Sequence, residues 1–329
     1  MSRLKLSMGC WSYDRTRSLL DGSIQPDGID LNYMSLPVEE TFFRMLRNRE
    51  FDVAEMSLSS YTVSLFQDSR FIAIPVFPSR FFRHSSIYVN ADSGIKEPKD
   101  LIGKRIGNPE YQMTALVWIR GVLSDEYGVP VNSVTYFTGG EEEANRSEKL
   151  ALDLPADIRV EPIGPTQTLS AMLGRGEIDA LYSARMPSSF HTSGGRVKRL
   201  FEDFLPVEQD YYRRTGIFPI MHTVVLRRDV YEQNRWAAQS LYKAFCQAQQ
   251  ETYKDLSQTV ALKVMLPWLT AHVEETQRQM GDDFWPYGFD KNRQTLSTFL
   301  RYSFEQGLSK HLLQPEQLFA PETLEAFKI

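Results

Sequence analysis

Apolar and polar positions along the first ninety residues follow the period of two that is typical of strands, interrupted by one helical stretch. Residues 4–10 alternate between apolar and polar and are expected to form a strand that ends near Trp11 and Ser12. The apolar spacing of residues 38–48 predicts an amphipathic helix, which a short break separates from a strand at 51–57. Further strands are expected at 28–36, 71–77 and 85–90.

A second series of the same kind begins near residue 101. Asn108 and Pro109 close a predicted strand at 104–108, and Asn as N-cap with Pro at the first helical position predicts a helix running to residue 128. The later strands are expected at 131–137, 158–163, 176–184 and 220–231, with a helix at 166–175 and a mostly helical tail. Strands that alternate with helices in this way predict an α/β fold.

One helix–strand junction occurs twice in the sequence. Residues 45–56 (MLRNREFDVAEM) and 172–183 (MLGRGEIDALYS) share Met, Leu, Glu and Asp in register, 127 residues apart. Such a repeat is expected of two lobes of one design, although chance recurrence of a common junction is the alternative. Because ligands bind beyond the carboxyl ends of strands in open α/β sheets, residues 55–59 and 182–187 are expected to face a common crevice.

The length of the chain predicts two lobes, and its charge argues against nucleic acid as a partner. A chain of 329 residues exceeds one ordinary core, so we predict lobe I at 1–88 plus 190–329 and lobe II at 89–189. The hydrophobic share of 42% and the charged share of 24% are ordinary for a globular protein. A net charge of −5 argues against a nucleic-acid-binding surface, which would be basic.

The N-terminal residues and the cysteines bear on compartment and metal binding. The first sixteen residues contain no apolar segment typical of a signal peptide, and no window is apolar enough for a membrane span, so we expect a cytoplasmic protein. Cys10 and Cys246 are far apart and predict neither a disulfide nor a zinc site. No HxH, HExxH, Walker or dinucleotide motif occurs, and GGEEEANR at 139–146 is expected to be a solvated turn rather than a phosphate loop.

The densest group of candidate binding residues is PSRFFRH at 78–84. It places Arg80, Arg83 and His84 among aromatic rings in an otherwise acidic protein, and arginine matches the geometry of a carboxylate. Arg185 and Ser188, just past another predicted strand, would add to such a site. A solvated basic loop and a structural ion pair are the alternatives for these arginines.

Two further groups complete the candidate site. Gln112 and Thr114 lie at the predicted start of a helix, where free backbone N–H groups favour anions, although an ordinary helix start explains them equally well. Glu55, at the end of a buried strand, and His84 and His222 are the candidate proton carriers, with a satisfied core histidine as the alternative for His222.

Several segments together resemble the 4,5-dihydroxyphthalate decarboxylase family over nearly the whole chain. They are FDVAEMS, PSRFFRHSSIYVN, DLIGKRIGNPEYQMTA, GEIDALYSARMP, MHTVVLRRDVY and FWPYGFDKNR, of which PSRFFRH and DFWPYG are the more specific. The resemblance implies a two-lobed periplasmic-binding-protein-like fold (type II) with the ligand cleft between the lobes. It also implies a carboxy-lyase of phthalate catabolism that forms protocatechuate and CO₂.

This chemistry suits the candidate residues. An aromatic ring with two carboxylates needs arginines, which we assign as Arg80, Arg83 and Arg185, with the leaving carboxylate facing Trp285 or the neighbouring phenylalanines. His84 or His222 would protonate the ring carbon while Glu55 polarises the phenol. The para hydroxyl supplies the electrons, so neither a cofactor nor a metal is expected.

Two other functions fit the same fold. One is a non-catalytic solute-binding protein for an aromatic carboxylate, against which the absent export signal argues. The other is a different enzyme on the same fold, against which PSRFFRH argues. We expect a small aromatic carboxylate as the partner, no nucleic acid and no membrane, and assembly into a homo-oligomer is left open.

Overall fold

The first of two sheets is built from strands drawn from both ends of the chain, in a computed structural model that describes residues 2–68 and 70–325. Its strand order is β2-β1-β3-β11-β4, in which β1 runs parallel to β2 and β3 while β11 runs antiparallel to β3 and β4. The strands are β1 (Leu4–Cys10), β2 (Ile29–Ser35), β3 (Val53–Ser57), β4 (Phe71–Arg80) and β11 (Ile220–Arg227).

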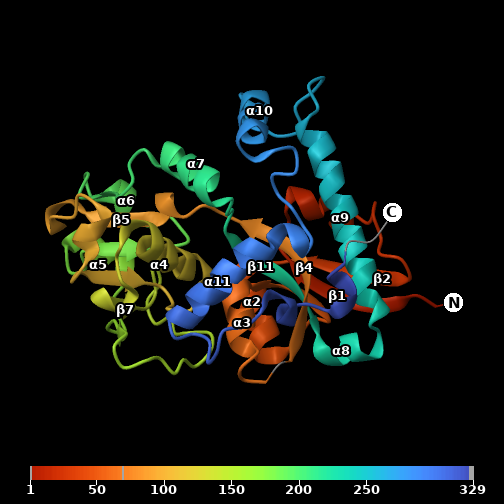
Figure 1. Cartoon of the computed structure of the whole chain (residues 1–329), viewed down its shortest axis with the longest axis horizontal. Helices are drawn as coiled ribbons and strands as arrows, with labels where there is room; N and C mark the ends of the chain where they lie inside the picture. Colours follow the sequence, from red (N-terminus) through yellow and green to blue (C-terminus); the bar gives the residue numbers. More distant parts are fainter. Residues whose placement is uncertain (1, 69, 326–329) are drawn as a thin grey trace. The chain divides into compact units, whose positions relative to one another are not determined.

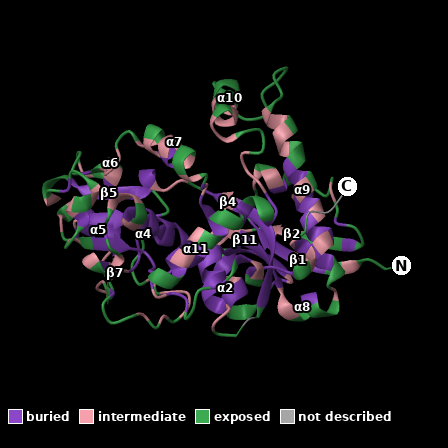
Figure 2. Cartoon of the chain, in the orientation of Figure 1, coloured by how far each residue is buried: buried purple, intermediate pink, exposed green. Residues whose placement is uncertain are grey.

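Helices pack on this sheet and extend beyond it, and Figure 1 shows them in the colours of the sequence. They are α1 (Arg17–Leu20), α2 (Val38–Asn48), α3 (Leu58–Ser64), α8 (Arg228–Gln233), α9 (Trp236–Leu256) and α10 (Leu269–Met280). β3 and α3 are buried along their whole length, and the inner strands of the sheet are purple in Figure 2. The end of β3 therefore lies in the interior of this part of the protein.

The second sheet has the strand order β10-β5-β9-β6-β7-β8, with β6, β7, β8 and β9 parallel and β5 antiparallel to β9. Its strands are β5 (Ile87–Asn90), β6 (Arg105–Asn108), β7 (Thr135–Thr138), β8 (Arg159–Pro162), β9 (Ala180–Tyr182) and β10 (Val197–Arg199). Its helices are α4 (Thr114–Tyr127), α5 (Leu169–Arg175), α6 (Ser189–Thr192) and α7 (Phe204–Thr215).

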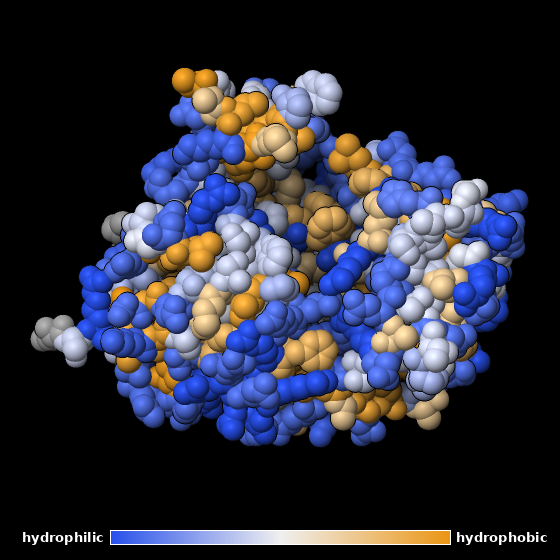
Figure 3. Space-filling view, turned by 180° about the vertical axis from the view of Figure 1, so that it is seen from behind, coloured by the Kyte–Doolittle hydropathy of each residue, from blue (hydrophilic) through white to orange (hydrophobic). Residues whose placement is uncertain are grey.

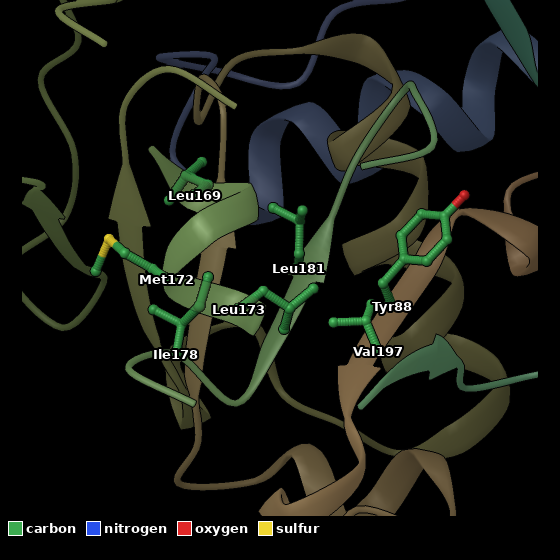
Figure 4. Packing of buried hydrophobic residues seen from close by; sticks show 7 residues of the cluster. All are labelled: Tyr88, Leu169, Met172, Leu173, Ile178, Leu181 and Val197. Carbon is green, nitrogen blue, oxygen red and sulfur yellow. The ribbon is translucent and has the colours of Figure 1, made fainter. Parts of the chain in front are cut away.

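The core of the second sheet is formed where α5 packs on β5, β9 and β10. Figure 4 shows the seven buried residues of this cluster: Tyr88, Leu169, Met172, Leu173, Ile178, Leu181 and Val197. Burial of these side chains removes apolar surface from water, which stabilises the sheet by about 25 cal/mol for each Å² buried. It also fixes β9, which leads into the segment after Tyr182.

The chain divides into two compact units, one for each sheet. The first unit comprises Met1–Arg80, Ile220–Leu296 and Gln314–Ile329, and the second comprises Phe81–Pro219 and Ser297–Leu313. Helix α11 (Arg293–Glu305) begins in the first unit and ends in the second. These boundaries differ from those expected at residues 88 and 190.

Two tertiary contacts explain where the second unit begins and ends. Glu208 of α7 accepts a hydrogen bond of 3.2 Å from the backbone N–H of Ser85, and β10 pairs with β5. Residues 81–88 and 190–219 therefore belong together in the second unit. The segment 297–313 joins them because Gln306 accepts a hydrogen bond of 2.7 Å from Arg120, a buried residue of α4.

Most predicted elements are present, with two local corrections. The expected helix after Asn108 begins only at Thr114, because the intervening loop is held by a 2.6 Å hydrogen bond from Arg120 to the Tyr111 carbonyl. The strand expected to run through residue 231 ends at Arg227, and α8 follows it directly. Both errors concern the ends of elements rather than their presence.

The repeated junction is one structural unit used twice. In the first unit Arg49 follows α2 with a φ of 52°, and in the second Gly176 follows α5 with a φ of 75°, so both helices are terminated by a residue in the left-handed region. Asp52 and Asp179 then each accept a 2.8 Å hydrogen bond from a backbone N–H of the neighbouring strand. The shared Asp and the shared turn therefore have the same structural role in both units.

The segment between α9 and α10 exposes large apolar side chains, which Figure 3 shows as an orange group near the top of the view. They are Val260, Leu262, Val264, Met265, Leu266 and Trp268. None of the helices in the described part of the chain combines a bilayer-spanning length with an apolar sequence.

Candidate active site

Glu55 and His222 meet side by side in the first sheet. Glu55 lies near the carboxyl end of β3, and the antiparallel strand β11 places His222 opposite Ser57, two residues further along. The His222 Nδ1 is 2.6 Å from Glu55 Oε1, while the Glu55 side chain is fully buried and the His222 side chain is 17% exposed. The carboxylate thus holds one imidazole nitrogen from the inside of the protein.

Three other donors hold the same carboxylate. The Tyr13 hydroxyl donates to Glu55 Oε1 at 2.6 Å, and the Trp11 backbone N–H donates to Oε2 at 3.1 Å. The Cys10 thiol lies 3.5 Å from Oε2. Burial by itself would raise the pKa of Glu55, but the hydrogen bonds from His222, Tyr13 and Trp11 hold it below its ordinary value. Glu55 is therefore an ionised carboxylate with all its contacts inside the protein.

His222 is oriented so that only its other nitrogen remains for chemistry. Its ring packs edge-on against Phe42, with ring centroids 4.9 Å apart. Among the residues that the structure describes, no hydrogen-bond partner is found for Nε2. A carboxylate bound to Nδ1 fixes the tautomer and stabilises the protonated imidazole, which is the arrangement of a general acid–base histidine.

Arg15, Tyr13 and Trp285 lie beside this pair. The Arg15 guanidinium is 4.1 Å from the centroid of the Tyr13 ring and 4.3 Å from that of the Trp285 ring. Its Nε donates to the Pro78 carbonyl at 2.6 Å, and the Trp285 indole N–H donates to the Phe77 carbonyl at 2.9 Å. Arg15 also pairs with Asp14 at 2.9 Å, so its charge is partly balanced where it lies on the aromatic rings.

Sequence reasoning did not select Tyr13 or Arg15. Tyr13 lies just before a short 3₁₀ turn (η1, Asp14–Thr16) and Arg15 lies within it, and no motif marks either residue. The signal that could have found them is topological, because β1 and β3 are parallel neighbours whose carboxyl ends lie together. Residues just beyond Cys10 are therefore placed next to Glu55.

Arg80 is a structural residue rather than part of an exposed binding loop. It is only 4% exposed, and its guanidinium donates to the Pro286 carbonyl at 2.7 Å and to the side-chain oxygen of Asn292. Both acceptors bind the same nitrogen, Nη2, in the interior of the first unit. The predicted role of Arg80 in substrate binding gains no support from these contacts.

Arg83 and His84 belong to the second unit. The Arg83 guanidinium lies 4.6 Å from the centroid of the Phe81 ring, and its Nη1 is 3.4 Å from the Ala184 carbonyl. Arg83 also interacts electrostatically with Glu208 of the same unit. Its role as a carboxylate ligand stays a prediction.

His84 is enclosed by aromatic rings. Its side chain is 3% exposed, and the rings of Tyr127, Phe201 and Tyr211 lie 5.3–6.3 Å from it. Neither ring nitrogen has a hydrogen-bond partner among the described residues. Burial, with a smaller contribution from Arg214, lowers the pKa of His84 to about 4, so the ring is neutral near pH 7. Of the two candidate histidines, the geometry favours His222 as the proton carrier.

Arg185 and Ser188 follow β9 in the second unit. Arg185 is exposed, and its backbone N–H donates to the Ser183 hydroxyl at 2.9 Å. Ser188 is held by Glu142, whose carboxylate accepts from its backbone N–H and its hydroxyl at 2.7 Å each. Arg185 therefore remains a candidate ligand, whereas Ser188 has an internal role.

Gln112 and Thr114 are covered by the chain itself. Gln112 is fully buried and donates to Glu148 Oε2 and to the Leu150 carbonyl, each at 3.1 Å. Glu110 pairs with Arg146 and Lys149 nearby. The start of α4 thus faces carboxylates of the protein, which disfavours the binding of an additional anion there.

A metal ion has no evident site in the part of the chain that the structure describes. No group of three or more His, Cys, Asp or Glu residues could hold one within 2–68 and 70–325. The expectation that catalysis needs no metal stays a prediction.

The fold is that of the periplasmic binding proteins. Two solved structures illustrate this likeness. The periplasmic sulfonate-binding protein SsuA from Methylobacillus flagellatus has a TM-score of 0.55 at 14% identity, over 97% of this chain and 92% of that one. The periplasmic aliphatic sulphonate binding protein SsuA from Escherichia coli has a TM-score of 0.52 at 13% identity, over 98% and 99%. Together with the two mixed sheets, these matches define a two-lobed type II fold of this class.

The sequence comparison assigns the family. The chain is 45% identical to 4,5-dihydroxyphthalate decarboxylase from Comamonas testosteroni over the full length of both proteins. It is 47% identical to 4,5-dihydroxyphthalate decarboxylase from Pseudomonas putida over 214 residues, which are 65% of this chain and 83% of that protein. A search of protein-family models gave no match. The chain belongs to the 4,5-dihydroxyphthalate decarboxylase family.

Proposed function

We propose that the chain is a carboxy-lyase that converts 4,5-dihydroxyphthalate to protocatechuate and CO₂ in phthalate degradation, with His222 as its proton carrier. Family membership supports the reaction, since the full-length relative at 45% identity carries this name. The observation that carries the choice of residue is the 2.6 Å hydrogen bond between His222 and the buried Glu55. It joins an ionised carboxylate to an imidazole whose second nitrogen remains available.

The proposed step is protonation of the ring carbon that bears the departing carboxylate. The protonated His222 donates from Nε2 to that carbon, and the phenol oxygen para to it stabilises the protonated ring. The carbon–carboxylate bond then breaks, its electron pair restores the aromatic ring, and CO₂ leaves. His222 regains its proton from water. Each such proton transfer by a positioned side chain contributes roughly 10²- to 10⁴-fold in rate.

Glu55 acts through His222 in this proposal. Its oxygens accept from His222, Tyr13 and the Trp11 backbone, so no oxygen is left to polarise the phenol directly. We therefore revise the role expected from the sequence and propose Glu55 as a positioning residue. It fixes the tautomer of His222 and stabilises the imidazolium.

Binding of the substrate rests on cations and rings. For the carboxylate that stays on the ring, we propose Arg83 and Arg185, because a planar guanidinium matches a carboxylate and Arg83 Nη1 lies 3.4 Å from the carbonyl of Ala184, the neighbour of Arg185. In the first unit, the rings of Tyr13 and Trp285 flank the Arg15 guanidinium, which also pairs with Asp14, and these rings offer an aromatic surface.

The test of this function is direct. Purified protein is incubated with 4,5-dihydroxyphthalate, and CO₂ and protocatechuate are measured together over time. Equal amounts of the two products are expected, and binding without turnover would make the protein a receptor instead. The same assay with His222→Asn tests the proposed proton carrier.

A further inference from the structure

The acidic segment after β7 is only partly a solvated turn. Glu142 and Glu143 are exposed, as expected, but the Glu141 side chain is folded inward and the residue is 8% exposed. Hydrogen bonds from the backbone of residues 169 and 170, at the start of α5, hold the carbonyls of residues 140 and 141. The position of Glu141 is therefore set by the fold of the second unit.

One oxygen of Glu141 is held and the other is not. The Ser183 hydroxyl donates to Oε2 at 2.6 Å, and the same hydroxyl accepts from the Arg185 backbone N–H at 2.9 Å. Oε1 is buried and has no hydrogen-bond partner in the described part of the chain. A buried polar atom without a partner is costly, and a ligand atom is one partner that would satisfy it at this edge of the sheet.

The surroundings of Glu141 combine burial with mixed charge. Burial raises the pKa of Glu141 to about 7, and the neighbouring Glu142 adds to this shift. The Ser183 hydrogen bond and the charges of Arg185 and Arg146 oppose it. A carboxyl group in this range is largely protonated below pH 7 and can then donate a hydrogen bond.

The location of Glu141 is one where ligands bind in folds of this kind. The parallel strands β6, β7 and β9 end together, and Glu141 and Ser183 follow β7 and β9. Because β5 is antiparallel to β9, its beginning lies at the same edge, and Arg83 precedes it. Open α/β sheets bind ligands beyond the carboxyl ends of their parallel strands.

We propose that Glu141, in its protonated form, donates a hydrogen bond to a carboxylate of the ligand, beside Arg83 and Arg185. The class of ligand, an aromatic dicarboxylate, rests on the proposed function. Two carboxyl groups can share a proton in this way, whereas two ionised carboxylates repel each other. Ligand affinity is therefore highest below pH 7 and falls as Glu141 ionises, by up to about tenfold for each pH unit.

Other titratable groups near this edge must be separated from Glu141. Arginine side chains stay charged throughout the range, and burial raises the pKa of Tyr88, so it stays neutral. Glu208 is different, because burial raises its pKa to about 7 as well and it interacts with Arg83. The test therefore uses substitutions of Glu141 itself rather than the pH dependence of the wild type alone.

The experiment measures the binding of phthalate, which cannot lose CO₂ by this route, by calorimetry between pH 6.5 and 9. Glu141→Gln keeps a hydrogen-bond donor but cannot ionise. We expect it to bind phthalate at pH 6.5 within about threefold of the wild type and to lose the affinity decrease above pH 7. Glu143→Gln, an equal change of charge at an exposed neighbour, should keep the wild-type profile.

Ser183→Ala gives a second and independent variant. Removal of the hydroxyl takes away a hydrogen bond that favours the ionised carboxylate, so the affinity decrease should move to higher pH. Parallel profiles for the wild type and Glu141→Gln would overturn the proposal. Failure of the wild type to bind phthalate at pH 6.5 would also overturn it, while turnover of 4,5-dihydroxyphthalate tests the proposed function separately.

Discussion

His222 Nδ1 lies 2.6 Å from Glu55 Oε1 across the antiparallel strands β11 and β3, with Glu55 fully buried and His222 partly exposed. The sequence alone made Glu55 and His222 both candidate proton carriers, and this contact gives each of them a separate role. The carboxylate stabilises the protonated imidazole from inside, and the histidine alone presents a nitrogen to a ligand.

The first prediction concerns His222. We expect His222→Asn to lower kcat by roughly 10²- to 10⁴-fold, because the amide cannot carry the proton to the ring carbon. Some loss of stability is also expected, because His222 is the main contact that keeps the buried Glu55 ionised, and urea unfolding measures this loss separately from kcat. His272→Asn, the same change at an exposed position of α10, is the control and should keep full activity. Normal kcat in His222→Asn would remove this residue from the mechanism.

The second prediction concerns the Tyr13 hydroxyl, which donates to Glu55 at 2.6 Å. In Tyr13→Phe the loss of that donor raises the pKa of Glu55, so the carboxylate becomes protonated at higher pH. We expect the acidic limb of the kcat/KM profile to move to higher pH. Tyr33→Phe is the matched control, because the Tyr33 hydroxyl donates to the Trp11 carbonyl. Identical shifts in both variants would contradict the assignment.

The third prediction separates Arg83 from Arg80. If Arg83 binds a carboxylate in a partly dry site, Arg83→Ala costs about 2–5 kcal/mol in kcat/KM with little loss of stability. Arg83→Lys should keep only part of the wild-type kcat/KM, since the point charge of lysine cannot make the two hydrogen bonds that a guanidinium makes to a carboxylate. Arg80→Ala should instead lower the free energy of unfolding by about 3 kcal/mol, since it loses charged hydrogen bonds in the interior. Steady-state kinetics and urea unfolding are measured for both variants. A loss of stability in Arg83→Ala together with a loss of kcat/KM in Arg80→Ala would refute the assignment.

The fourth prediction concerns His84 and acid stability. Burial depresses the pKa of His84 from 6.5 to about 4, so the unfolded chain takes up the proton first as pH falls. The pKa difference leaves the free energy of unfolding intact above pH 6.5 and lowers it as pH falls from 6.5 to 4. Between pH 7 and pH 5 the free energy of unfolding drops by about 2 kcal/mol. In urea unfolding, the free energy of unfolding of His84→Phe should fall less between pH 7 and pH 5 than that of the wild type. The variant should also retain activity. His191→Phe, at an exposed position, should behave as the wild type does.

The sequence alone determined the elements and the class of fold. Alternation at residues 4–10 and the junction repeated at 45–56 and 172–183 depend on local spacing, and the structure has a strand and two matching junctions there. Segments such as PSRFFRH and DFWPYG indicated the family, which the full-length relative shows. Glu55 and His222 could be proposed because each lies on a predicted strand of apolar residues.

Only the tertiary structure decided which candidates act together. His222 and Glu55 are 167 residues apart, and strand pairing alone brings them to hydrogen-bond distance. Tyr13 joins them because β1 and β3 are neighbours, a fact that no local pattern encodes. Conversely, PSRFFRH looks like one basic loop, yet Arg80 donates inside the first unit and His84 lies among aromatic rings of the second. Burial and long-range contacts set the charge state and the partners of these side chains, and neither can be inferred from the identities of sequence neighbours.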